Sequence, residues 1–285
     1  MEQLYQVVGI SRQLYFKCFN YQKKMSTLYS KIKEVVLGLR EDHPRMGART
    51  LYTLMKLTGT IGINRFERFL SEEGLSLAPN KNAYKTTNSN HAWLKYENLL
   101  NGLKLTDVNQ VWGSDITYFM VQDKVYYIVF IEDLYSRRIL GYSANDNMFH
   151  QNNTSVLNAS IELRKGADLN GLIHHSDKGS QYCSNAYIDL LNQNNMMISM
   201  ANTSIENPYV ERLNGTLKND YLYPRNRVND LITLRKELDI VVYLYNYVRP
   251  HSQLGKISPM EFERKLKTIP MEKRMIMELY NFEKR

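Results

Sequence analysis

The chain has 285 residues, of which 43% are hydrophobic and 23% are charged, a composition that supports a globular core and excludes a disordered protein. Lysine and arginine outnumber aspartate and glutamate by 37 to 29, and the net charge of +8 favours a polyanionic partner such as nucleic acid. Cys18 and Cys183 fit no zinc-ligand spacing, and no apolar run or signal-peptide core predicts membrane insertion or export. We therefore expect a soluble protein inside the cell.

Residues 1 to 75 are predicted to be helical throughout. Residues 25 to 42 carry apolar side chains every three to four positions, which is typical of an amphipathic helix. A helix-turn-helix candidate lies on each side of this segment. In the first, over residues 4 to 19, Gly9 breaks the chain and Ser11 caps the next helix. The second, over residues 48 to 75, turns between positions 59 and 62.

The last helix of this region is predicted to be capped by Asn64 and to end at Gly74. Arg65 and Arg68 lie three positions apart on it, and they suit either a face turned to a DNA groove or a merely solvated face. Residues 1 to 75 show no heptad run that is long enough for a coiled coil.

Residues 76 to 106 are polar, with a proline and little periodicity, and are predicted to be a linker. Strand-like and helix-like segments then follow in a regular order. The predicted strands are 109–121, 124–133, 137–146, 171–177 and 196–202, and the predicted helices between them are 154–165 and 184–195. This order predicts an α/β fold over residues 107 to 265, with a mixed five-stranded sheet and helices on both faces. Residues 266 to 285 are expected to form a helical tail.

Three carboxylates stand out in this second region. Asp115 lies within the first strand between apolar neighbours, where a charge is costly unless something pairs with it. Asp177 follows a short apolar strand, at the edge of the sheet where open α/β folds bind ligands. Glu211 falls in the first turn of a helix. Taken singly, Asp177 also suits a helix cap and Glu211 a partner of the helix dipole.

The helix that carries Glu211 has two distinct faces. Asn214 and Lys218 share a polar face with Glu211, at i+3 and i+7. The adjacent face is an apolar stripe, formed by Val210, Leu213, Leu217 and Tyr221. We therefore expect the apolar face to pack against the protein and the polar face to look onto a site.

Three carboxylates in a basic protein suit two Mg²⁺ ions, which prefer hard oxygen ligands, and Mn²⁺ is expected to substitute for them. Two such ions activate a hydroxyl nucleophile and stabilise the leaving oxygen of a phosphodiester. This chemistry is typical of nucleases and transposases.

At this point the sequence resembles the retroviral-integrase-like DDE transposases, and most closely the OrfB-type catalytic protein of the IS-three group of bacterial insertion sequences. The motifs "HPRMGARTLYTLM" and "INRFERFLSEEGL" resemble the group's helix-turn-helix, "VWGSDITYF" and "HHSDKGSQY" its two aspartate motifs, and "YNYVRPHSQLGKISPMEF" its C-terminal signature. The resemblance implies an RNase H-like core, with Asp115, Asp177 and Glu211 as the metal-binding triad. The DNA contacts expected from the motifs and from position are Arg65, Arg68, Lys178, Asn214 and Lys218.

The chain departs from the group between the second aspartate and the glutamate. Residues 178 to 210 leave 33 positions there, fewer than the group usually has, and "ANTSIENPYVE" replaces a glycine-containing segment. We interpret the difference as a shortened active-site loop. It leaves Glu206 as a less favoured third carboxylate.

Several other residues are predicted to be structural. His174 and His175 are expected to be core or backbone-bonded histidines rather than site residues. Ser258 and Glu261, with Pro259 between them at the first helical position, predict a capping box. The tyrosines of "YLYNYV", at 243 to 248, are expected to pack a helix against the sheet rather than to stack on bases.

The resemblance implies Mg²⁺-dependent cleavage at the ends of an insertion sequence and transfer of the freed 3′-hydroxyl into DNA. The expected partners are the terminal inverted repeats and target DNA, a second copy of the chain on DNA, and a product of an upstream frame fused to Met1; no membrane partner is expected. We expect a bacterial cytoplasmic protein associated with the nucleoid. The alternatives are a structure-selective RNase H-like nuclease, a DNA-binding regulator without activity, and an RNA-binding scaffold.

Overall fold

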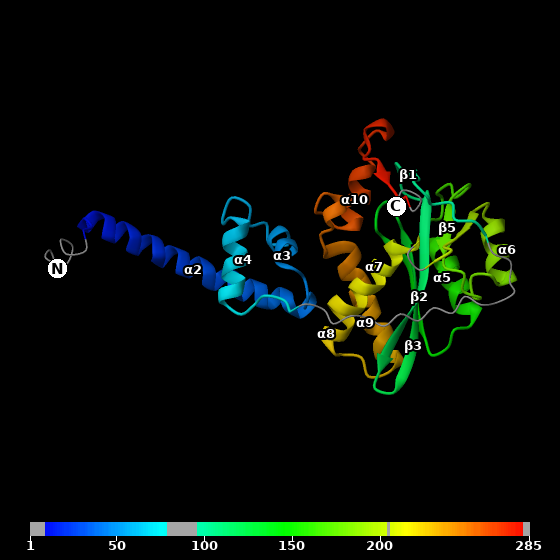
Figure 1. Ribbon diagram of the computed structural model, residues 1–285, viewed down its shortest axis with the longest axis horizontal. Coiled ribbons are helices and arrows are strands. Elements are labelled where there is room, and N and C mark those ends of the chain that lie inside the picture. The colour runs from blue at the N-terminus through cyan, green and yellow to red at the C-terminus, as the bar shows by residue number, and fades with distance from the viewer. Residues whose placement is uncertain (1–8, 79–95, 204–205, 282–285) are drawn as a thin grey trace. The chain divides into compact units, whose positions relative to one another are not determined.

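A single long helix, α2 (Arg12–Asp42), supports the first of the two compact units into which the chain divides, Met1–Leu77 and Ala78–Arg285. This computed structural model describes residues 9–78, 96–203 and 206–281. Two short helices, α3 (Ala48–Leu54) and α4 (Ile63–Glu72), pack against the C-terminal half of α2 (Figure 1). The core of this unit is formed by the buried side chains of Ile32, Val36, Met46, Leu51, Leu57, Ile61, Phe66, Phe69 and Leu70.

The ends of these helices agree only in part with the sequence prediction. Ser11 caps α2, because its hydroxyl accepts a hydrogen bond from the Leu14 N–H at 3.1 Å. The prediction of an Asn64 cap is wrong: Gly62 is the N-cap of α4 and its extended backbone starts the helix without a side-chain bond. Gly74 follows α4 with a φ of +68°, as a helix end by glycine requires. Residues 4 to 8 of the first helix-turn-helix candidate lie outside the described residues.

The second unit contains the predicted mixed five-stranded sheet, with the strand order β4-β3-β2-β5-β6. The strands are β2 (Val111–Val121), β3 (Lys124–Asp133), β4 (Ile139–Asn145), β5 (Ile173–Ser176) and β6 (Met197–Met200). The first three form an antiparallel meander, and β5 and β6 continue the sheet in parallel on the other side of β2. The strand β2 therefore lies at the centre of the sheet, which confirms the fold class.

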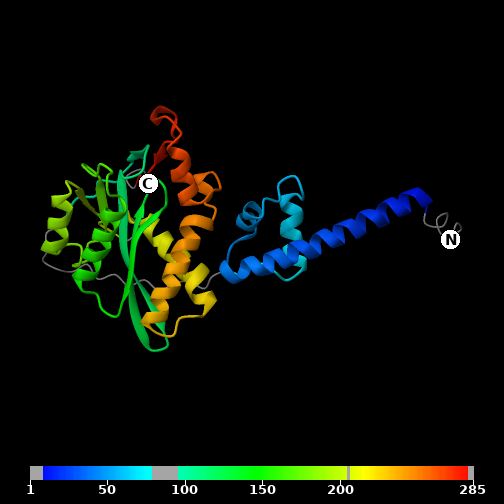
Figure 2. The same ribbon diagram turned by 180° about the vertical axis from the view of Figure 1, so that it is seen from behind.

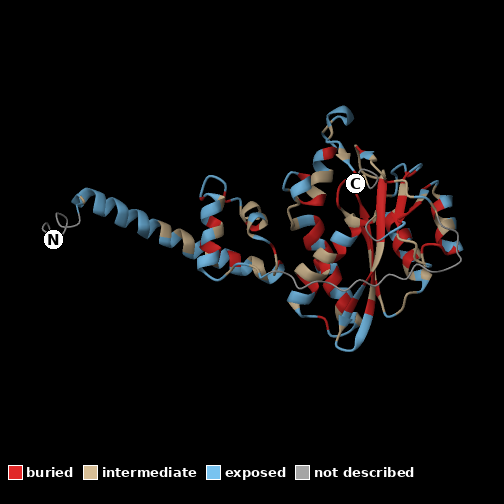
Figure 3. Ribbon diagram, viewed as in Figure 1, coloured by how far each residue is buried: buried red, intermediate tan, exposed pale blue. Residues whose placement is uncertain are grey.

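The alternation of side chains along β3 shows why helices cover both faces. Ile128 and Phe130 pack into a core with α7 (Pro208–Thr216) and α9 (Leu231–Tyr243). Figures 1 and 2 show both helices on one side of the sheet. Val129 and Ile131 enter a second core with α5 (His150–Leu163) and α6 (Asn185–Gln193) on the opposite face. A strand that is buried on both faces reads as a continuous apolar run, which explains the sequence pattern. Figure 3 shows that the centre of the sheet is buried.

Two helices of this unit continue into π-helical stretches. α7 runs on through η2 (Leu217–Leu222) into α8 (Tyr223–Arg225), and α9 runs on into η3 (Leu244–Val248). As predicted, Val210, Leu213, Leu217 and Tyr221 are all buried. Within the described residues, no helix is both long and apolar enough to cross a membrane.

The chain then folds back through two short helices, η4 (Ser252–Leu254) and α10 (Pro259–Leu266). The Ser258 hydroxyl caps α10 by accepting from the Glu261 N–H, as predicted, but the Glu261 carboxylate bonds Arg264 instead of completing a capping box. A complete capping box, which the sequence analysis missed, starts α9 with Asp230 and Thr233.

The C-terminal segment differs from the predicted helical tail. After one 3₁₀ turn, η5 (Met271–Lys273), it forms β7 (Met277–Glu278), which pairs antiparallel with β1 (Lys104–Leu105). The strand β1 lies inside the predicted linker. The two errors share one cause, because each strand exists only through its pairing with a segment that is distant in sequence.

A network of largely buried charges ties α10 to the sheet. The Glu263 carboxylate accepts hydrogen bonds from Arg138 at 2.8 Å, from Arg164 at 2.9 Å and from the Ser136 hydroxyl at 2.8 Å. Arg164 also lies 3.9 Å from Asp133, which is completely buried at the end of β3. The network therefore joins three elements, α5, α10 and the turn between β3 and β4.

We predict that Glu263→Gln destabilises this unit by about 3 kcal/mol at neutral pH, because it leaves two buried arginines without their shared carboxylate. Burial raises the pKa of Glu263, but the hydrogen bonds and charges of Arg164 and Arg138 outweigh it and hold the pKa below its ordinary value. Because the folded pKa is the lower one, this stabilisation is present above the unfolded pKa and is lost as the pH falls through the folded pKa.

Chemical denaturation between pH 7 and pH 3 measures the effect, and the acid limb of the stability profile should be flatter in the variant. Glu261→Gln is the matched control, since Glu261 lies on the same helix but pairs only with exposed cations. Equal behaviour of the two variants would contradict a role for the buried network.

Candidate active site

The register of two parallel strands places Asp177 beside Asp115. Val111 pairs with Ile173 and Gly113 with His175, so partners differ by 62 in number (173 − 111 and 175 − 113). With the same offset of 62, the residue in register with Asp115 is Asp177, which lies one residue beyond the end of β5. Side chains in register on neighbouring parallel strands point to the same face. The two aspartates therefore share one face of the sheet, at the point where β5 ends.

Glu211 reaches this face from helix α7, which approaches β2 unusually closely. A Cβ atom added to Gly113 would lie 2.6 Å from a methyl group of Val210 and 3.0 Å from Leu134. Only glycine leaves room for the helix here. Beside it, the Asn207 amide donates to the Ser114 carbonyl at 3.2 Å. The first turn of α7, with Glu211, is thus held directly against the strand that carries Asp115.

Asp115 interacts electrostatically with both other carboxylates. Its side chain is half-buried, and protein atoms surround most of the carboxyl group. Burial first, and the charge of Asp177 second, raise the pKa of Asp115 to about 8, and the charge of Glu211 acts in the same direction. The backbone N–H of Ile116 and the charge of Lys218 oppose this rise. The charges of Asp177 and Glu211 therefore both act on the Asp115 carboxyl.

Two other residues of the predicted polar face contact the same region. The Asn214 amide donates to Asp115 Oδ2 at 2.7 Å, and its own Oδ1 atom is buried without a hydrogen-bond partner. The Lys218 ammonium donates to the Tyr118 carbonyl at 3.1 Å. Burial lowers the pKa of Lys218, and the charge of Asp115 counteracts that effect. Asn214, predicted as a DNA contact, thus bonds a carboxylate in this structure.

The loop between β6 and α7 engages the alternative carboxylate, Glu206. Its Oε2 atom accepts from the Asn98 amide at 2.7 Å, from the Asn202 backbone N–H at 2.9 Å and from the Asn202 amide. Lys178, on the other side of the loop, donates to Asn202 Oδ1 at 2.6 Å. The Glu206 carboxylate is therefore held by Asn98 and Asn202, which favours Glu211 as the third carboxylate.

The two histidines before Asp177 are buried and hydrogen-bonded, as expected for core residues. His175 bonds the Ser199 hydroxyl at 2.8 Å and the Glu206 carbonyl at 3.2 Å, and His174 bonds the Tyr187 hydroxyl at 2.9 Å. Burial lowers the pKa of His174 to about 3 and that of His175 to about 4, so both are neutral at physiological pH. They pack on opposite faces of β5, His175 on the side of Asp177 and His174 on the other.

The donor set suits a divalent cation. Asp115, Asp177 and Glu211 offer only oxygen atoms, and the repulsion that raises the pKa of Asp115 is the cost that a bound cation would remove. In the described parts of the chain, no three His, Cys, Asp or Glu side chains are already close enough together to enclose a metal ion. Binding would therefore require the carboxylates to turn toward a common centre.

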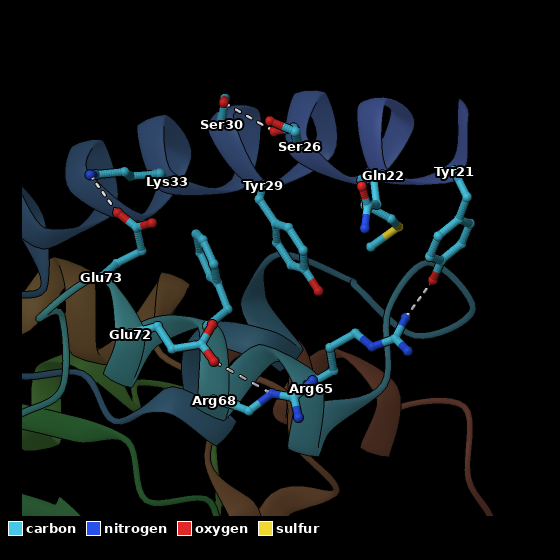
Figure 4. Close-up of a pocket in the computed structure, with 12 residues that line it drawn as sticks. Tyr21, Gln22, Ser26, Tyr29, Ser30, Lys33, Arg65, Arg68, Glu72 and Glu73 are labelled. Atoms are coloured by element: carbon cyan, nitrogen blue, oxygen red, sulfur yellow. Dashed lines mark hydrogen bonds and ion pairs between the residues drawn. The ribbon is translucent and has the colours of Figure 1, made fainter. Parts of the chain in front are cut away.

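The predicted DNA-binding arginines lie in the other unit, along a groove of about 600 Å³ between α2 and α4 (Figure 4). Arg65 donates to the Tyr21 hydroxyl at 2.9 Å, and Arg68 lies 3.7 Å from Glu72. Phe69 and Tyr29 stack in the same groove with ring centroids 4.7 Å apart. Both arginines are exposed, so they remain accessible to a ligand.

Sequence reasoning missed Gly113 and Asn207, which set the position of α7. A glycine inside an otherwise apolar strand was the available signal, since it often marks a close approach of another segment. Nothing in the local sequence identified Val210 as the neighbour, because the contact joins residues that are far apart along the chain.

We predict that Gly113→Ala destabilises the second unit by about 1–3 kcal/mol, because buried Val210 cannot move away from the added methyl group. Adding Val210→Ala should recover part of this loss, although Val210→Ala alone removes buried apolar contacts. Thermal and chemical unfolding of the three variants measure the coupling.

Gly215→Ala is the control for this pair of variants. Gly215 lies in α7, the helix that carries Val210, and a Cβ atom added there meets no neighbouring atom. Alanine also favours a helix, so no loss of stability is expected. Strictly additive effects of the Gly113 and Val210 substitutions would show that the close approach does not constrain α7.

Comparison with known proteins gives consistent matches along the chain. Residues 106–204 and 196–259 each match a family described as an integrase core domain. The chain is 34% identical over 271 residues to the uncharacterized 31 kDa protein of insertion element IS600 from Shigella sonnei, a match that covers 91% of this chain and 97% of that protein. It is 27% identical over 235 residues to the transposase InsF for insertion sequence IS3A from Escherichia coli strain K12, with 81% of each chain covered.

A solved structure supports the fold. A chain in the cryo-EM structure of the simian T-cell lymphotropic virus intasome in complex with PP2A regulatory subunit B56 gamma matches with a TM-score of 0.50 and 16% identity, over 80% of this chain and 74% of that chain. The five-stranded sheet and its helices are accordingly RNase H-like. With a relative that is 34% identical along nearly its whole length, the chain belongs to the IS3-type DDE transposases of insertion sequences.

Proposed function

We propose that the protein is the DNA transposase of an insertion sequence, and that Asp115, Asp177 and Glu211 hold two Mg²⁺ ions, for which Mn²⁺ substitutes. The observation that supports the proposal is the meeting of two aspartates, in register on β2 and β5, with the first turn of α7. When bound, such ions activate a water or a 3′-hydroxyl and neutralise the charge that develops at the phosphodiester. The reaction class is phosphodiester cleavage followed by transfer of the 3′-hydroxyl end.

The chain's own residues have separate tasks in this proposal. The three carboxylates hold the ions through their oxygen atoms. Asn214 orients the Asp115 carboxylate through its 2.7 Å hydrogen bond. Lys218 lies on the same face and contacts a phosphate of the bound DNA once it leaves the Tyr118 carbonyl. Lys178, beside Asp177, is the second proposed phosphate contact of this unit.

Glu211→Gln is predicted to abolish both cleavage and joining, while folding and DNA binding stay close to those of the unchanged protein. The amide keeps the shape of the side chain but loses the charge that binds a metal ion. Assays with end-containing duplex DNA and Mg²⁺ test the prediction, and Ca²⁺ should support binding without efficient chemistry.

Glu206→Gln is the matched control and should have a mild effect, since Glu206 accepts hydrogen bonds from Asn98 and Asn202 and is not proposed to bind a metal ion. A Glu211→Gln protein that still cuts would overturn the assignment of the triad. Cleavage without joining by the unchanged protein would instead identify a structure-selective nuclease.

We propose that the helical unit binds duplex DNA through Arg65 and Arg68, and that the protein acts on terminal inverted repeats and target DNA as a homo-oligomer. The support is the position of both arginines on an exposed helix face at the groove of Figure 4, together with the net charge of +8. Fusion to the product of an upstream frame, with better recognition of the terminal repeats, stays a prediction from the resemblance.

Affinity for non-specific duplex DNA is predicted to fall steeply with salt, because released counterions drive the binding of lysine and arginine to phosphates. The double variant Arg65→Ala, Arg68→Ala should weaken binding and lower the slope of log K against log salt by up to about 2. Fluorescence anisotropy titrations at several ionic strengths measure the slope.

A charge-matched control removes two exposed cations of the second unit, Lys165 and Arg264, which pair with glutamates on their own helices or turns. This control should leave the slope nearly unchanged. An affinity that does not depend on salt would contradict extended phosphate contact, and equal slopes for the two double variants would remove the two arginines from the interface.

A further inference from the structure

The position of Glu211 depends on what holds the start of α7, and one buried cation lies against that start. The guanidinium carbon of Arg137 lies 4.6 Å from the centre of the Tyr209 ring, in the first turn of the helix and two residues before Glu211. The Tyr209 hydroxyl accepts a hydrogen bond from the Tyr280 N–H at 2.8 Å. Tyr209 therefore contacts Arg137 through its ring and the C-terminal segment through its hydroxyl.

Arg137 is itself held in an uncommon conformation. It lies in the turn between β3 and β4 with a φ of +60°, which side chains other than glycine adopt only at a cost, and it is 6% exposed. Its Nη2 atom contacts the Met277 sulfur at 3.5 Å, and its backbone N–H donates to the Asp133 carbonyl at 2.8 Å. Such a backbone persists only where the surroundings fix it.

Arg137 also interacts electrostatically with the carboxyl group of Glu132. This residue pairs with Gly113 across the strands, so its side chain lies on the face that α7 covers. Burial raises the pKa of Glu132 to about 7, while the charges of Arg137 and Arg212 lower it. The carboxyl is 1% exposed and lies 3.5 Å from the Tyr245 hydroxyl, so no solvent screens its attraction to Arg137.

The C-terminal signature motif encloses this arrangement from the other side. Asn246 bonds both backbone groups of Ile139, directly after the Arg137 turn, at 2.9 Å. His251 packs edge-on against Tyr245, with ring centroids 4.6 Å apart. Arg249 donates to Asp220 at 3.0 Å and thereby holds the continuation of the α7 helix. The motif therefore contacts both the turn and the helix that Arg137 joins.

We infer that Arg137 is a positioning residue for Glu211: by lying across Tyr209 it fixes the start of α7, and the signature motif holds Arg137 in the conformation that this contact requires. The inference rests on the proposed function in one respect, namely that Glu211 binds a metal ion. It assigns a task to the signature motif, which has no residue among the three carboxylates.

The experiment compares full-length Tyr209→Leu with Tyr209→Phe. Leucine removes the ring, whereas phenylalanine keeps the ring under Arg137 and loses only the hydroxyl. Hydrogen–deuterium exchange of the α7 amides, without metal or DNA, should be about tenfold faster in Tyr209→Leu and within about twofold of the unchanged protein in Tyr209→Phe. The Mg²⁺ concentration for half-maximal cleavage should rise about tenfold in the leucine variant only.

Arg137→Lys keeps a cation but loses the flat guanidinium, and an intermediate shift is expected. Combined with Tyr209→Leu it should add nothing further, because both changes remove one contact. Arg138→Lys is the control, since Arg138 bonds Glu263 and not α7. A shift in Arg138→Lys as large as that in Arg137→Lys would overturn the inference.

Two other outcomes would also overturn the positioning role: leucine and phenylalanine variants that behave alike, or faster α7 exchange with an unchanged Mg²⁺ requirement. Failure of the proposed function looks different. In that case the unchanged protein neither cleaves DNA nor binds Mn²⁺ in calorimetry, while the exchange comparison still decides whether Arg137 fixes α7.

Discussion

The constraint on which the second unit depends is the carboxylate of Asp115, placed in the central strand of a five-stranded sheet. Its pKa of about 8 records how poorly the metal-free protein tolerates that charge. Asp177 and Glu211 raise the pKa further, and the Ile116 N–H and the charge of Lys218 offset only part of this rise. A fold that concentrates like charges at one place is stable only if the rest of the structure fixes that place rigidly.

Particular contacts fix the elements that surround the three carboxylates. The absence of a side chain at Gly113 sets the distance between β2 and α7, and an increase of one methyl group would change it. The buried network of Glu263 ties the turn after β3 to α5 and α10. The same turn carries Arg137. The turn between β3 and β4 therefore takes part in two separate sets of contacts, one to α10 through Arg138 and one to α7 through Arg137.

The strands and helices of the sheet could be predicted from sequence because their signals are local. A run such as residues 124 to 133 has the length and the residue types of a buried strand, and the structure has β3 over the same residues. Asp115, Asp177 and Glu211 could be named because each belongs to a short motif with a characteristic order. The register that brings two of them together was beyond the sequence, since it depends on hydrogen bonds between β2 and β5.

The errors in the sequence prediction lie where the structure depends on backbone conformation or on contacts between distant segments. Asn64 has the residue type of a helix cap, but the extended backbone of Gly62 starts α4 two positions earlier. The strand β7 is only two residues long and owes its existence to β1, so its own sequence carries no strand pattern. Arg137 carried no signal at all: an arginine in a turn is ordinary until Tyr209, Met277 and Glu132 are seen around it. Residues that position a site are recognised by their neighbours, and here those neighbours come from three different elements, α7, β7 and β3.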